Sequence, residues 1–142
     1  VLSETAQTPL FMRCPGQRHG QRRQELAQTT DLWPTLYEAF GIGTEGVSVG
    51  EKSFSLLPWA RGDESNEREK VTTRGGGGIA LRTRERMAMG ASPAHRAAVP
   101  VTEPPAPQLF IKPDDLWETL DVGSSTPAEM EEWRQRLESA IE

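Results

Sequence analysis

Four carboxylates lie close together near the C-terminal end of the sequence and could supply oxygen ligands for a cation. They are Asp114, Asp115, Glu118 and Asp121. An EF-hand calcium loop needs ligands at alternating positions, a central glycine and a terminal glutamate, and this order is absent. We therefore expect no calcium loop at these carboxylates.

The two histidines offer no better metal or acid–base site. His19 lies in a polar segment and His95 in a segment rich in proline. Neither has an acidic partner nearby, or a second ligand at the spacing that zinc sites use. We predict that both are surface residues.

Four consecutive glycines, residues 75–78, could be taken for a phosphate-binding loop. Such a loop is followed by Lys-Ser/Thr, or by the start of a helix that points at the anion. Here the glycines lead into Ile79-Ala80-Leu81, which is typical of a strand. Residues 63–78 are charged and then glycine-rich, so we predict a mobile linker across this range.

Basic residues are concentrated between positions 68 and 86. Arg82, Arg84 and Arg86 alternate with other residues, which predicts that they lie on one side of a strand. No aromatic residue is interleaved with them, although stacking on nucleic-acid bases requires aromatic side chains. We interpret the arginines as a solvated sheet face and expect no nucleic-acid partner.

The composition is that of a small soluble globular domain. The chain has 142 residues, of which 35% are hydrophobic and 26% charged, with a net charge of −5. No run approaches the eighteen apolar residues that a membrane helix needs, so no membrane association is expected. The one cysteine excludes an internal disulfide. We interpret the start at Val1, without a methionine, as a sign that the sequence is a fragment.

The N-terminal half predicts one strand and one helix. A short apolar run predicts a buried strand over residues 8–13, which Pro15-Gly16 would end. A helix is predicted over residues 31–40, with Thr30 or Asp31 capping its free amides. Its apolar stripe would consist of Leu32, Leu36, Ala39 and Phe40.

The C-terminal half predicts two strands and a helix. The first strand begins at Ile79, and a second at residues 109–111 is stopped by Pro113. A capping box, Thr126 with Glu129, predicts the start of the final helix. One face of the first strand would consist of Ile79, Leu81, Thr83, Met87 and Met89. The apolar face of the helix would consist of Met130, Trp133, Leu137 and Ile141.

Several segments, in this order, resemble the C-terminal part of a sulfatase of the alkaline-phosphatase superfamily. Residues 8–16 read TPLFMRCPG, residues 29–36 read TTDLWPTL, and residues 115–122 read DLWETLDV. They are similar to V-P-L-x-R-x-P-G, to T-D-L-x-P-T-L and to D-P-x-E-x-x-N-L. Residues 52–62 and 81–83 resemble two further family segments. In the last segment Leu116 and Asp121 replace the family's proline and asparagine. The resemblance implies that this acidic segment is a structural turn whose carboxylates cap backbone amides.

The resemblance implies a sulfuric ester hydrolase as the parent protein. Such an enzyme attacks sulfur with a formylglycine made from Cys or Ser in a C/S-x-P-x-R motif, beside a calcium ion. Cys14 does not reproduce this motif, because Pro15 comes one residue early and Gly16 occupies its place. We predict a buried structural thiol at Cys14, and we assign no catalytic, cofactor-binding or metal-binding residue in this chain.

The expected fold is an α+β fragment of an α/β alkaline-phosphatase-like fold. Residues 1–62 would end the α/β domain, residues 63–78 would be the linker, and residues 79–142 would form a small antiparallel sheet with a packed C-terminal helix. The chain alone would be inactive, because its partner, an N-terminal catalytic domain, would carry the calcium, the formylglycine and the site for a small sulfated substrate. The alternatives are a non-catalytic interaction module and a phosphoryl or phosphonate hydrolase of the same superfamily.

Overall fold

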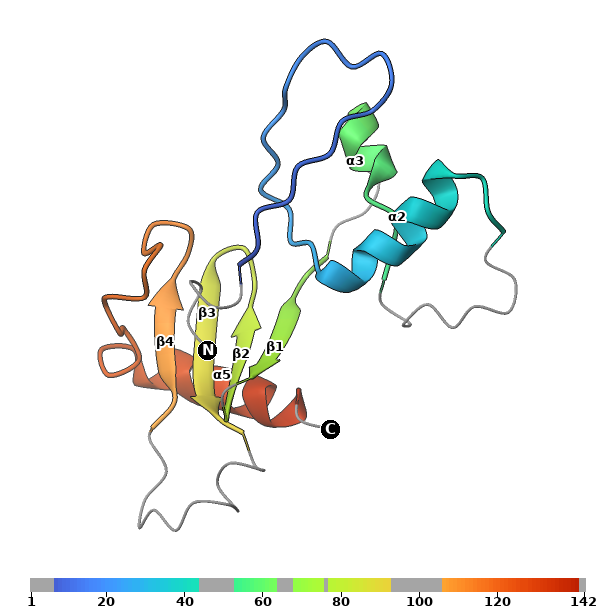
Figure 1. Ribbon diagram of the computed structural model, residues 1–142. Coiled ribbons are helices and arrows are strands. Elements are labelled where there is room, and N and C mark those ends of the chain that lie inside the picture. The colour runs from blue at the N-terminus through green and yellow to red at the C-terminus, as the bar shows by residue number, and fades with distance from the viewer. Residues whose placement is uncertain (1–6, 44–52, 64–67, 76, 93–105, 141–142) are drawn as a thin grey trace. The chain divides into compact units, whose positions relative to one another are not determined.

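The computed structural model describes residues 7–43, 53–63, 68–75, 77–92 and 106–140 (Figure 1). The chain forms two compact units, one of residues 9–69 and one of residues 1–8 with 70–142. The first unit contains η1 (Thr29–Asp31), α2 (Leu32–Ala39) and α3 (Leu57–Arg61), and the second contains β1 (Val71–Gly75), β2 (Gly78–Arg82), β3 (Arg86–Ala91), β4 (Gln108–Ile111) and α5 (Pro127–Ser139). In the described part of the chain, no helix is long and apolar enough to span a bilayer.

The second unit is built on an antiparallel sheet whose strand order, β1-β2-β3-β4, follows the sequence. Gly75 pairs with Gly78 across the first hairpin, and Leu81 pairs with Ala88 across the second. Gly77 has φ +77°, a left-handed conformation that glycine adopts without steric cost. Gly75 and Gly78 therefore lie at the two ends of a tight hairpin connection.

Helix α5 covers one face of this sheet (Figure 1). Trp133 and Leu137, four residues apart on the helix, are both buried against the strands. The predicted terminal helix and its packing on an antiparallel sheet are confirmed. The cluster under the helix consists of Ile79, Leu81, Ala88, Leu109, Trp133 and Leu137, and a second buried cluster consists of Ala80, Met87, Met89 and Phe110.

The prediction of a single strand running on from Ile79 is wrong. The chain turns back between β2 and β3, where the Thr83 amide donates to the Arg86 carbonyl and the Arg86 amide donates to the Thr83 hydroxyl. The turn changes the alternation, so Met87 belongs to a different cluster from Ile79. Arg82, Arg84 and Arg86, which were predicted to share one solvated face of a strand, lie instead at the end of β2, in the turn and at the start of β3.

The predicted linker at residues 63–78 is also wrong over its last part. Residues 71–75 form β1, which pairs with β2 through five residue pairs. Val71 and the two threonines after it are β-branched, and such residues favour strands. Along the sequence, the boundary between the two units falls between residues 69 and 70, inside the predicted linker of residues 63–78.

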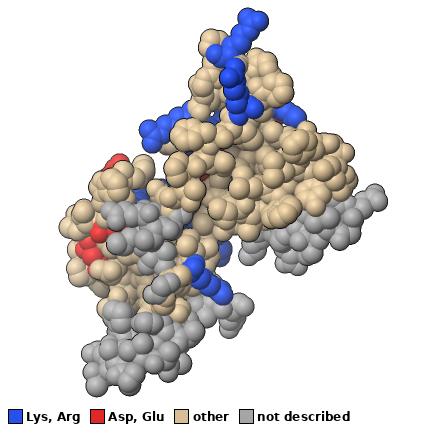
Figure 2. Space-filling view, viewed as in Figure 1, with Lys and Arg blue, Asp and Glu red and all other residues tan. Residues whose placement is uncertain are grey.

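In the first unit, η1 and α2 lie where the helix was predicted, and Gly41 follows the helix with φ +66°. The strand predicted at residues 8–13 is not present. A strand needs a neighbour to take up its backbone hydrogen bonds, and none of the described strands pairs with this segment. The long loop that precedes η1 carries several basic side chains (Figure 2).

Candidate functional site

The acidic segment after β4 is a turn held by its own carboxylates, as predicted. Oδ1 of Asp115 accepts hydrogen bonds from the amide and the hydroxyl of Thr119, each at 2.9 Å, and Oδ2 accepts from the Leu120 amide at 3.0 Å. The backbone N–H groups of Thr119 and then of Leu120 lower the pKa of Asp115, because they stabilise its charged form. The side chain is a backbone cap.

Asp121 fastens the same turn to the sheet. Its Oδ1 accepts hydrogen bonds from the Leu109 amide in β4, at 3.0 Å, and from the Gly123 amide, at 2.9 Å. An added Cβ at Gly123 would lie 2.8 Å from Sδ of Met130, so the methionine side chain would have to move. The carboxylate and the glycine together bring the turn close to the first residues of α5.

A buried ion pair, which the sequence did not predict, closes this segment. The side chains of Lys112 and Glu118 are both fully buried and bonded to each other. The Lys112 ammonium also donates to the carbonyls of Asp115, at 2.5 Å, and Leu116, at 3.3 Å. Burial lowers the pKa of the Arg82 guanidinium, and the charge of Glu118 opposes this effect. The only sequence signal was a lysine that directly continues an apolar strand.

The first unit contains a second buried ion pair. Both oxygens of Asp31 accept from the Arg68 guanidinium, with Nη1 at 2.5 Å from Oδ2 and Nη2 at 2.7 Å from Oδ1. The carboxylate also accepts from the amides of Gln28, at 2.7 Å, and Phe54, at 3.3 Å. Asp31 therefore joins three segments far apart in sequence, and it does not cap the amides of the following helix as predicted.

Thr35 extends this network. Its hydroxyl donates to the Asp31 carbonyl at 2.6 Å and accepts from the Leu56 amide at 2.9 Å. The Arg68 guanidinium lies 4.5 Å from the centre of the Phe54 ring, close enough for a cation–π contact. The buried polar groups of Asp31 and Thr35, at and near the start of α2, thus find their hydrogen-bond partners within the first unit.

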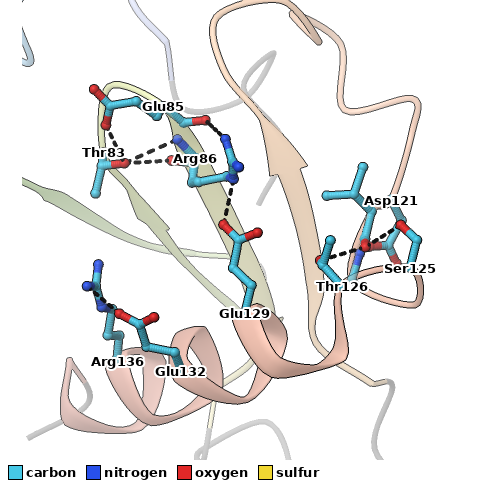
Figure 3. Close-up of polar contacts among 11 residues, drawn as sticks. Thr83, Glu85, Arg86, Asp121, Ser125, Thr126, Glu129, Glu132 and Arg136 are labelled. Carbon is cyan, nitrogen blue, oxygen red and sulfur yellow. Dashed lines mark hydrogen bonds and ion pairs between the residues drawn. The ribbon is translucent and has the colours of Figure 1, made fainter.

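The capping box predicted at the start of α5 does not form (Figure 3). The Thr126 hydroxyl donates to the Val122 carbonyl at 2.9 Å. The Glu129 carboxylate accepts instead from Nε of Arg86, at 2.7 Å. This ion pair links the helix to β3, so a tertiary contact replaces the local one.

Neither Cys14 nor His19 lies in a reactive arrangement. Cys14 is half-buried, and not buried as predicted; its amide donates to Oε1 of Gln17 at 3.1 Å. His19 is exposed, as predicted. His95 lies outside the described residues. Within the described ranges, no group of three or more His, Cys, Asp or Glu side chains could hold a metal ion.

No protein-family model matches the sequence, and no curated protein matches it. Among solved structures, the chain is similar to a Bacteroides thetaiotaomicron sulfatase, BT33336S-sulf, described in connection with the metabolism of multiple glycosaminoglycans. The TM-score is 0.55 and the sequence identity 18%, over 78% of this chain. The chain spans only 24% of the length of that sulfatase. The four-stranded antiparallel sheet and its helices are therefore parts of a sulfatase-like fold.

Proposed function

We propose that this chain is the C-terminal part of a sulfatase-like hydrolase that cleaves sulfate esters. It would be inactive alone, because the chemistry would belong to an N-terminal catalytic domain outside the sequence. The similarity in fold to a sulfatase, over a quarter of that protein's length, supports this proposal. Within it, the present chain completes and stabilises the hydrolase fold.

The observation that carries the proposal is an apolar surface on and after α2. Five large side chains on this surface are between 37% and 74% exposed, and Phe11, in the segment predicted as a strand, is 93% exposed. An exposed apolar area of this kind marks an interaction site on a soluble protein. The residues of this α2 apolar surface are Leu32, Trp33, Leu36, Phe40 and Ile42.

The other side of α2 explains why the surface has a defined shape. Asp31 and Thr35 are buried and hydrogen-bonded to Phe54, Leu56 and Arg68. These contacts hold the helix from its polar side and leave the apolar stripe facing outward. The stripe is therefore a surface for a partner, and we take the missing catalytic domain to be that partner.

Calcium and formylglycine belong to the proposed parent enzyme and not to the described residues. Asp115 accepts from backbone amides and Glu118 from Lys112, and the described residues contain no group of three or more His, Cys, Asp or Glu side chains that could hold a metal ion. In the proposal, both groups are held by the rest of the enzyme. Calcium should therefore leave the Tm of the 142-residue chain unchanged, whereas a rise would show a metal site that our assignment lacks.

The first test is to read the source DNA upstream of the Val1 codon. The proposal expects a C/S-x-P-x-R motif in the same continuous frame. The protein encoded by that frame should then hydrolyse 4-nitrophenyl sulfate, while the 142-residue chain should not. Faster hydrolysis of 4-nitrophenyl phosphate or of a phosphonate ester would replace the sulfatase assignment by the corresponding hydrolase. A stop codon followed by a start near Val1 would refute the enzymatic proposal.

The α2 apolar surface gives a second test with a matched control. In the longer protein, L36Q/F40Q should weaken the attachment of this region and lower the Tm and the activity, because two apolar contacts would be lost. In the isolated chain the same pair should lower self-association and change stability by less than about 0.5 kcal/mol, as surface substitutions do. Exposed Leu120, in the other unit, supplies the control L120Q. If L36Q/F40Q left the longer protein unchanged, the surface would not be a domain contact.

A further inference from the structure

The loop before η1 carries a concentration of positive charge that the proposed fold does not use. Residues 9–24 contain four arginines and no aspartate or glutamate, although the whole chain has a net charge of −5. This loop is the blue segment at the top of Figure 1. On the face seen in Figure 2, basic side chains gather over it. We call residues 13–23 the basic loop.

Three of the four arginines are free to bind a ligand. Arg23 is anchored, since its guanidinium donates to the Trp59 carbonyl at 3.0 Å and lies 3.5 Å from Glu25. Arg13, Arg18 and Arg22 are exposed, and they form no ion pair or hydrogen bond with any side chain in the described ranges. Intramolecular pairing therefore accounts for only one of the four charges.

Local hydrogen bonds give the loop a defined course. The Gln17 amide donates to the Cys14 carbonyl at 3.1 Å, and Oε1 of Gln17 accepts from the Cys14 amide at the same distance. Nε2 of Gln17 donates to the His19 carbonyl at 3.1 Å. With the Arg23 anchor, these contacts hold both ends of the segment that presents Arg18. A loop held in this way loses less conformational entropy when a ligand binds.

We propose that the basic loop binds a sulfated polysaccharide. Guanidinium groups donate two parallel hydrogen bonds to tetrahedral oxyanions, which suits arginine to sulfate groups spaced along a chain. Exposed Gln21 and Gln24 lie beside the arginines and offer amide groups to sugar hydroxyls. The choice of a sulfated polymer rests on the proposed sulfatase function. The basic loop would then hold a polymeric substrate outside the catalytic centre.

Single-stranded nucleic acid is the competing polyanion, and the loop is poorly suited to it. Sequence-tolerant binding of single strands uses aromatic side chains on which the bases stack. No phenylalanine, tyrosine or tryptophan occurs between Phe11 and Trp33. The loop therefore offers charge and hydrogen-bonding groups without a stacking platform.

The test is binding of the full 142-residue chain to fluorescent dextran sulfate at physiological ionic strength, measured by anisotropy. The variant R13Q/R18Q/R22Q removes the free arginines of the loop. The control K70Q/R134Q/R136Q makes the same change in net charge at exposed positions in the other unit. We expect the loop variant to bind about tenfold more weakly, from three solvent-exposed ionic contacts. The control should bind within about twofold of wild type, and neutral dextran should not bind.

Three results would overturn the proposal. They are unchanged binding by the loop variant, an equal loss in the control variant, and tighter binding of polyadenylate RNA than of dextran sulfate. The assay involves no hydrolysis, so it separates the two proposals. Loop-dependent binding without sulfatase activity in the longer protein would refute the hydrolase function alone. Activity without loop-dependent binding would refute the role of the basic loop alone.

Discussion

Removing the Asp31 carboxylate should disrupt the first unit, because it would leave buried groups without partners. The side chains of Asp31 and Arg68 are 0% and 6% exposed, respectively. In Asp31→Ala the guanidinium loses two short hydrogen bonds, and the amides of Gln28 and Phe54 lose their acceptor. Breaking a buried ion pair by deleting one partner costs about 3–5 kcal/mol. That is a large share of the 5–15 kcal/mol that typically stabilises a domain.

The assay is native-state hydrogen exchange by mass spectrometry on the 142-residue chain. A loss of about 3 kcal/mol corresponds to exchange more than about a hundredfold faster at the Leu56 amide, which Thr35 holds in this network. Peptides from the β-sheet serve as an internal reference, since they belong to the other unit. Asp63→Asn is the matched control, because Asp63 is exposed, and it should change stability by less than about 0.5 kcal/mol.

A double-mutant cycle tests whether the ion pair itself causes the loss. Arg68→Met should also destabilise, because it strands the Asp31 carboxylate in a buried site. The double variant should lose about 2 kcal/mol less than the sum of the two single variants, since neither charge is then left alone. Additive effects, or an Asp31→Ala variant as stable as the Asp63 control, would refute this account of the buried pair.

Three further outcomes are expected in the second unit. Asp115→Asn should make the loss of stability in acid less steep, as urea denaturation across pH 2–6 would measure. Because the folded-state pKa of Asp115 is lowered, its contribution to stability is present above the unfolded pKa of about 3.9 and is lost as the pH falls through the folded pKa. Gly123→Ala should cost about 1–3 kcal/mol by forcing Met130 aside, and Met130→Ala in the same chain should recover part of that loss; no recovery in thermal melts would exclude the clash. Glu129→Gln should cost about 0.5–1 kcal/mol, and Glu132→Gln, on the more exposed pair, only about 0.3 kcal/mol; the reverse order in chemical denaturation would contradict the role of the link to β3.

The features predicted correctly from the sequence are those that depend on neighbouring residues. Apolar spacing located α2 and α5, and the short apolar run of residues 109–111 located β4. The capping role that the resemblance implied for the acidic segment is confirmed at Asp115, whose partners lie four and five residues away. The hydrogen bonds of the two helices and of the Asp115 turn close within a few residues, so a local pattern is sufficient to predict them. Strand β4 depends on pairing with β3, and only its apolar run is local.

The features that the sequence alone did not determine depend on partners distant along the chain. Glu129 could pair locally with the start of α5, but the approach of β3 brings Arg86 within 2.7 Å of its carboxylate. Arg68 reaches Asp31 across 37 residues. A charged side chain is stable when buried only if its partner is brought beside it. The sequence by itself therefore determined where the helices lie, because apolar spacing is a local property, while the tertiary structure decided which charges are buried together and which face each strand presents.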